Sequence, residues 1–131
     1  MRKDIEIPKV KDIYIVAVKE WDEDFLSQNW NVYLINNSQR DMEATIVVSR
    51  GSDADRKTAT LRHGLGTIPA QSSRKIEFIA EEVLQFKNEF LLTFFAEGKL
   101  YDRTFVFEPG AINEGNLKPI PLLEEEGVAA H

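Results

Sequence analysis

The chain has 131 residues, a formal net charge of −6 and no cysteine. This length corresponds to one domain that can bury its own core, and the negative charge disfavours nucleic acid as a partner, because the phosphate backbone is negative as well. The lack of cysteine excludes a disulfide framework, a zinc site with thiolate ligands and a cysteine nucleophile.

Two further observations concern location in the cell. Residues 1–8 carry charged side chains where a secretory signal needs an apolar segment. No apolar run approaches the roughly 18 residues of a membrane span. We therefore expect a cytoplasmic protein that does not associate with membranes.

The first half of the chain predicts three strands separated by turns. Residues 13–18, 30–35 and 44–49 are rich in β-branched and aromatic side chains, which favour strands. The second segment ends at Asn36, in an Asn-Asn-Ser run that tolerates turn geometry, and the polar residues 50–55 end the third.

The middle of the chain predicts shorter elements. Residues 57–63 alternate between polar and apolar side chains, as a strand does, and the glycines of residues 64–66 then bend or bulge the chain. Residues 75–79 predict another short strand. Residues 80–87 predict one short helix of at most two turns, because acidic side chains near its start suit the helix dipole.

The segment 90–107 predicts a β-hairpin that turns at residues 97–99. A hairpin with one face in water alternates apolar and polar residues, but here both faces are largely apolar. One face would carry Phe90, Leu92, Phe94 and Ala96, and the other Leu91, Thr93 and Phe95. Both faces therefore need cover, by a sandwich core on one side and by a helix, the tail or a second subunit on the other.

Together these elements predict an all-β fold. The number of short strands and the spacing of the turns favour an immunoglobulin-like antiparallel β-sandwich of about seven strands, with one short helix and an extended C-terminal tail. The Cys–Trp–Cys signature of true immunoglobulin domains is absent, and a small barrel is the alternative.

The chain divides into a sandwich domain, residues 1–109, and a C-terminal tail, residues 110–131. The tail combines two prolines, which favour an extended path, with apolar side chains that are costly to leave in water. These apolar residues are Leu117, Ile120, Leu122 and Leu123. We expect the tail to dock, either on its own domain or on a partner subunit.

One segment is a candidate ligand site. Arg62 could hold an anion, His63 is of the residue type that titrates near neutral pH when unperturbed, and Gly64 and Gly66 would let a ligand approach the backbone. The alternative is a purely structural role for this segment. In that case Arg62 pairs with a neighbouring strand, His63 caps the strand end, and the glycines form a bulge. No serine or acid is paired with His63 in the sequence, so we assign no catalytic residue.

The acidic loop around Asp53 and Asp55 lacks the spacing of a calcium loop and is followed by two basic residues. We read it as a solvated turn. The sequence predicts no metal ion and no cofactor.

A self-association surface is suggested by the surplus of apolar residues in segments 13–18 and 90–96, since one internal face is enough for a sandwich sheet. We predict a homodimer, or binding to another protein. The predicted interface residues are Tyr14, Val16, Phe95, Leu117, Ile120, Leu122 and Leu123.

Several segments together resemble a family of short bacterial proteins of uncharacterised function, members of which sometimes carry the label phenylalanyl-tRNA synthetase alpha subunit. The similarity spans nearly the whole chain. It is carried by residues 5–8, 32–37, 58–63, 88–90, 105–107 and 116–121. This resemblance implies a role as an accessory to translation.

The main functional prediction is a non-enzymatic, cytoplasmic β-sandwich that works by protein interaction or as a structural protein. One alternative is a small-ligand-binding or catalytic protein that uses the Arg62 and His63 region. Another is the accessory to translation that the family label implies.

Overall fold

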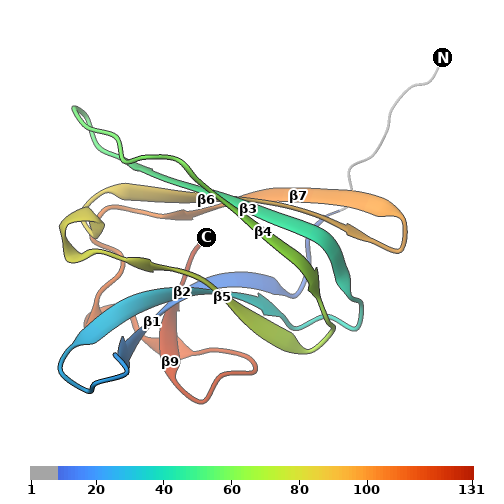
Figure 1. Cartoon of the computed structure of the whole chain (residues 1–131), viewed down its shortest axis with the longest axis horizontal. Helices are drawn as coiled ribbons and strands as arrows, with labels where there is room; N and C mark the ends of the chain where they lie inside the picture. The colour runs from blue at the N-terminus through green and yellow to red at the C-terminus, as the bar shows by residue number, and fades with distance from the viewer. Residues whose placement is uncertain (1–8) are drawn as a thin grey trace.

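The computed structural model describes residues 9–131, which form two antiparallel β-sheets packed face to face (Figure 1). Residues 1–8, on which the prediction of no secretory signal depends, lie outside this range. Within the described range the strands are β1 (Ile13–Trp21), β2 (Gln28–Asn36), β3 (Met42–Ser52), β4 (Leu61–Ile68), β5 (Ser72–Ile79), β6 (Lys87–Ala96), β7 (Lys99–Phe107), β8 (Lys118–Pro119) and β9 (Glu126–Ala129). The two short 3-10 turns are η1 (Glu81–Val83) and η2 (Glu114–Asn116). The predicted all-β fold with two sheets is confirmed.

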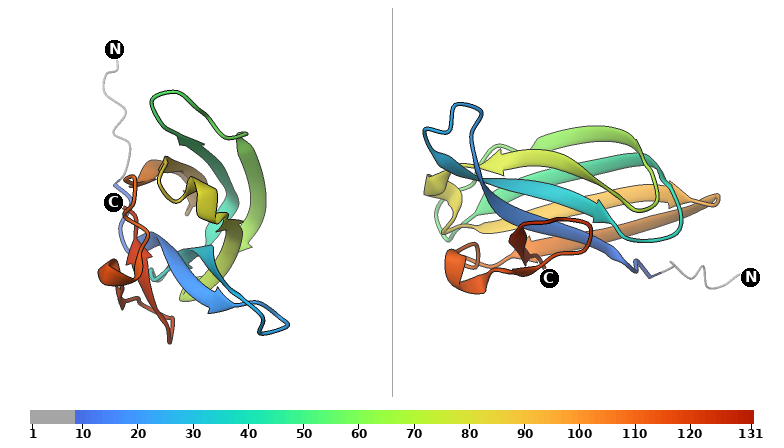
Figure 2. Two further views of the ribbon diagram at one scale, coloured as in Figure 1. Left: turned by 90° about the vertical axis from the view of Figure 1, so that its left-hand side faces the viewer. Right: turned by 90° about the horizontal axis from the view of Figure 1, so that it is seen from below.

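The strands are divided between a five-stranded sheet, in the order β5-β2-β1-β9-β8, and a four-stranded sheet, in the order β4-β3-β6-β7. The pairs β1–β2, β3–β4 and β6–β7 are antiparallel neighbours in sequence. Figure 2 shows the two sheets curving around a common interior. The connection from β4 to β5 passes from one sheet to the other, so these two strands are sheet edges that face each other.

The core lies between the sheets and is filled by alternate residues of each strand. In β6, Phe90, Leu92 and Phe94 are almost completely buried. The ring of Phe90 meets that of Phe107 edge to face, with centroids 5.9 Å apart. The rings of Phe94 and Tyr101 stack at 5.0 Å. The predicted hairpin therefore places its Phe90 face in the core.

The gap between the sheets on the β1 and β7 side is closed by the end of the chain. The backbone N–H of Ala130 donates to the carbonyl of Ile15 in β1. The backbone groups of His131 exchange two hydrogen bonds with Val106 in β7. The C-terminal segment thus bonds to both sheets, whereas no ladder joins β4 to β5 on the other side.

The tail also covers the outer side of the five-stranded sheet. Ile120 is 8% exposed and packs in one cluster with Val16, Val18 and Ile35, all of which are fully buried. Leu123 packs against the same cluster. The surplus apolar side chains of residues 13–18 are therefore covered by the same chain.

The prediction of a short helix at residues 80–87 was wrong, because only the single turn η1 forms there. Its hydrogen bonds all span three residues, as in a 3-10 turn. The side-chain amide of Asn88 donates to the carbonyls of Val83 and Phe86 and so replaces the bonds that a longer helix would make. A helix this short also cannot recover the cost of nucleation.

The strand predicted at residues 57–63 begins only at Leu61. Before it, Lys57 makes a single bridge to Ser52, and the rest is a loop. The glycines at 64 and 66 do not end the strand but lie within β4, where the pairing with β3 shifts register and Gly66 has a φ of +68°.

Candidate functional site

No described element lies over the outer face of the four-stranded sheet (Figure 1). This face carries apolar side chains that belong to neither core cluster. Phe95 and Leu100 are 42% and 48% exposed, and the others are half-buried. We call this surface the four-strand face, and its apolar members are Ile46, Val48, Leu91, Phe95, Leu100 and Val106.

Strand register brings these side chains together. Val48 of β3 lies opposite Leu91 of β6, and Phe95 of β6 lies opposite Leu100 of β7. Opposite residues in a sheet have Cβ atoms about 5 Å apart, so the apolar groups form a continuous strip rather than isolated exposures. The apolar side chains of β6 that point away from the core therefore form part of this surface.

Charged residues lie at the edges of the four-strand face, and Arg50 of β3 and Glu89 of β6 form an ion pair within it at 3.1 Å. Arg62 is on β4, opposite Val48. Asp102 is on β7, opposite Thr93. Both are exposed. The apolar strip is thus bordered by a basic side chain on one edge and an acidic side chain on the other.

The other predicted interface residues lie elsewhere. Val16 is fully buried beneath the tail, and Tyr14 is half-buried in the same cluster. In the tail, Ile120 and Leu123 pack inward, whereas Leu122 is 45% exposed. Leu117 packs against the edge of the main core. Among the predicted interface residues, only Phe95 contributes to the four-strand face.

The four residues predicted as a ligand site are separated by strand alternation. Arg62 and Gly64 face outward, whereas His63 lies opposite the buried Val47 and faces the interior. Gly66 is exposed at the bulge of β4.

His63 instead contacts residues far away in sequence. Its Nε2 lies 2.7 Å from Oε1 of Glu77 in β5, and the hydroxyl of Ser49 donates to the same oxygen at 2.6 Å. An ionised carboxylate can only accept, so Nε2 carries the proton. This contact joins the two sheets across the open β4 and β5 edge.

The arrangement does not form a nucleophile and base. A catalytic serine needs an imidazole nitrogen within hydrogen-bond reach of its hydroxyl. Here one carboxylate oxygen lies between Ser49 and His63 and receives a hydrogen bond from each. In residues 9–131 no group of three or more metal-binding side chains converges.

The acidic loop before β4 forms a local ion pair. The Asp53 carboxylate accepts a hydrogen bond from the guanidinium of Arg56, which lowers the pKa of Asp53 below its usual value.

A cleft of about 270 Å³ opens at this edge of the sandwich. Its walls come from the ends of β3, β5 and β6, from η1 and from the start of β4. Ser49 and Gly51 occupy the inward positions of β3 here, so no large side chain fills the space. The cleft was not foreseen, because the sequence does not show that these strand ends meet.

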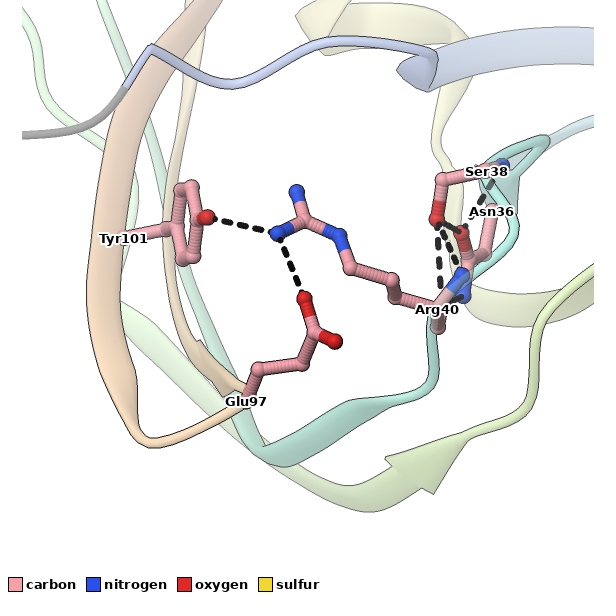
Figure 3. A network of polar contacts seen from close by, with 5 residues as sticks. All are labelled: Asn36, Ser38, Arg40, Glu97 and Tyr101. Atoms are coloured by element: carbon pink, nitrogen blue, oxygen red, sulfur yellow. Dashed lines mark hydrogen bonds and ion pairs between the residues drawn. The ribbon is translucent and has the colours of Figure 1, made fainter.

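A polar network closes the opposite end of the sandwich (Figure 3). The guanidinium of Arg40 donates to the hydroxyl of Tyr101 at 2.9 Å and to Glu97 at 3.2 Å. The fully buried amide of Asn36 donates to the carbonyls of Arg40, Ile68 and Pro69. These contacts tie the β2–β3 turn to the β4–β5 and β6–β7 turns, which is a structural role.

Among residues 9–131, the most exposed large apolar side chains lie in the β1–β2 turn, where Phe25 and Leu26 are 74% and 82% exposed. They follow the acidic residues 22–24, and the carboxylate of Asp22 accepts hydrogen bonds from the backbone N–H of Leu26 and the hydroxyl of Ser27. These bonds lower the pKa of Asp22 below its usual value, with the Ser27 hydroxyl as the main cause. Trp21, at 56% exposure, ends β1 at the same turn, so these apolar groups belong to the tip of one hairpin and not to a sheet face.

Comparison with family models, with curated proteins and with solved structures gave no match. The similarity to the bacterial family, and the role beside translation that it implies, therefore stay predictions. No helix in the described part of the chain is long and apolar enough to cross a membrane.

Proposed function

We propose that the protein works by association and that the partner on the four-strand face is a second copy of the same chain. One observation carries this proposal. The outer sides of both sheets bear surplus apolar side chains, but only those of the five-stranded sheet are covered by the tail. The surface left on the four-strand face favours burial against a partner.

The size of the face suits a dimer. Four strands about 4.8 Å apart, each with about eight paired residues of roughly 3.4 Å, cover roughly 500 Å² in projection. Side chains that project from the sheet, and residues around its rim, increase this buried area toward the value of a standard interface, which is about 800 Å² per partner. Phe95, at 42% exposure, alone has about 85 Å² left to bury, which corresponds to about 2 kcal/mol.

The charges favour one symmetric arrangement. With a two-fold axis in the interface parallel to the strands, the β4 edge of one copy faces the β7 edge of the other. Arg62 of each copy then lies near Asp102 of the second copy. An axis perpendicular to the strands would instead bring two Arg62 side chains together, which is unfavourable.

Sedimentation velocity of the full chain tests the proposal. At about 50 µM, which exceeds a micromolar dissociation constant, we expect a species of twice the 15.0 kDa chain mass. Phe95→Asp should return it to 15.0 kDa, whereas the matched change Phe25→Asp in the exposed β1–β2 turn should leave the dimer intact. A wild-type chain that stays monomeric, or a Phe95→Asp dimer, would overturn the proposal.

A charge exchange tests the orientation. Arg62→Asp should weaken the dimer, and Arg62→Asp combined with Asp102→Arg should restore it, because the opposite charges then meet again. If neither variant changes the dimer, the proposed association stands, but this two-fold axis is wrong.

We further propose that the first seven strands belong to the immunoglobulin-like class. The order of β1, β2 and β5 in one sheet and of β3, β6 and β7 in the other supports this, because it matches the ABE and CFG strands of that class. The fourth strand stays beside β3 instead of joining the other sheet. An experimental structure with a different strand order would reject this assignment.

A further inference from the structure

We propose that the cleft between β4 and β5 binds a small organic amine, a ligand with an apolar body and one ammonium group. The proposal rests on the chemistry of the cleft wall and is independent of the dimer. A cleft of about 270 Å³ lies just below the roughly 300–1,000 Å³ range of drug-sized sites, which suits a smaller ligand.

Most of the cleft wall is apolar. Ile79 of β5 and Phe90 of β6 form part of the buried core, and Val83 of η1 packs against it. Leu61 and Phe78 at the mouth are 47% and 61% exposed. A ligand body that contacts these side chains would leave water.

Two acceptor atoms of the wall, on Glu77 and Asn88, have no hydrogen-bond donor among the described residues. Oε1 of Glu77 receives hydrogen bonds from Ser49 and His63, while Oε2 receives none from the described residues. The carboxylate is only partly exposed, with 18% of the side-chain surface accessible. The free oxygen Oε2 of this carboxylate can therefore accept a charge-assisted hydrogen bond from a cation.

Asn88 supplies the second acceptor. This residue is 7% exposed, and its amide nitrogen donates to two carbonyls, which fixes the orientation of the amide. Its Oδ1 lies over Gly51, where an added Cβ would approach it to 2.9 Å, and it accepts no hydrogen bond from any described residue. A buried acceptor without a donor is rare and costly, and a ligand N–H would satisfy it.

The other polar groups at the cleft are already engaged. The hydroxyl of Thr58 accepts from Gly51 and donates to the carbonyl of Ala59. The guanidinium of Arg50 pairs with Glu89 on the outer face at 3.1 Å. The groups left for a ligand are therefore a carboxylate oxygen and an amide oxygen. Both accept hydrogen bonds, and the charge of the carboxylate favours a cation over a neutral or anionic ligand.

The test uses the full chain and three probes of one shape: 2-phenylethylamine, 2-phenylethanol and 3-phenylpropionate. Titration followed by amide chemical shifts should show changes centred on residues 49–51, 77–79 and 88–90. We expect the ammonium probe to bind with a Kd of about 1 mM or tighter, and at least about tenfold more tightly than the alcohol. The carboxylate probe should bind least.

Variants separate the two parts of the site. Glu77→Gln should weaken amine binding about tenfold or more and leave alcohol binding unchanged, because only the charge is removed. Phe78→Ala, at an exposed position, should weaken both probes alike. Glu89→Gln removes a carboxylate on the outer face and should change neither.

Three outcomes would overturn the proposal. These are no saturation by the amine at about 10 mM, equal binding of amine and alcohol, or unchanged amine binding by a folded Glu77→Gln protein.

Discussion

The packing of the tail predicts a measurable loss of stability when Ile120 is truncated. Ile120→Ala removes most of a side chain that is 8% exposed and packs on Val16, Val18 and Ile35. Buried Ile-to-Ala changes cost about 2–5 kcal/mol. Because this site lies at the outer side of a sheet and can partly collapse, we expect about 2–3 kcal/mol, or roughly 10 °C in Tm for a chain of this length.

Urea unfolding measured by the fluorescence of the buried Trp30 provides the assay. It is best done with Phe95→Asp in all samples, so that dimerisation does not add to the stability. Leu122→Ala is the matched control, because Leu122 lies in the same tail and is 45% exposed. Its cost should stay below about 1 kcal/mol. If Ile120→Ala and Leu122→Ala cost the same small amount, the tail does not dock in solution as described.

The same assay tests three further contacts. Gly127→Ala should cost about 1–3 kcal/mol, because its Cβ would lie 2.9 Å from the Ala17 carbonyl oxygen and 3.2 Å from Ile120, whereas Gly64→Ala meets nothing within 4 Å and serves as control. Asn36→Ala should cost at least about 2 kcal/mol, since it leaves buried carbonyls unpaired; a smaller loss would contradict the network of Figure 3. Burial and the hydrogen bond to Glu20 raise the pKa of Tyr33. Stability should therefore be intact below about pH 10 and fall above it, where the unfolded chain releases this proton first; Tyr33→Phe, but not Tyr14→Phe, should reduce that fall.

The strands could be predicted because their signal is local. β-branched and aromatic runs gave β1, β2, β3 and the β6–β7 hairpin within a few residues of their bounds. The errors came where a local pattern has more than one cause. The alternation at residues 57–60 belongs to a loop, and the acids at the start of η1 begin only one turn, because Asn88 takes up its carbonyls.

The candidate sites could be predicted less well because their contacts are distant in sequence. His63 could be singled out as a candidate from the sequence. Its partner Glu77 could not, because the chain between them passes from one sheet to the other and β4 contains a bulge. Alternation indicates that Arg62 and His63 point to opposite sides, but not which side is the interior. The free acceptor of Asn88 depends on the turn η1, which was expected to be a helix.

The two proposed sites share β3 but use opposite sides of it. Ile46 and Val48 point to the four-strand face, whereas Ser49 and Gly51 point into the cleft. The mouth of the cleft lies at the β4 and β5 edge, with Leu61 and Phe78 at its rim, and not on the face that a second copy would cover. Amine binding should therefore saturate at one ligand per chain and have the same Kd for the wild-type dimer and for the Phe95→Asp monomer. A Kd that changes with the oligomeric state would show that dimerisation reaches the β4 edge, where Arg62 of the four-strand face follows Leu61 of the cleft mouth.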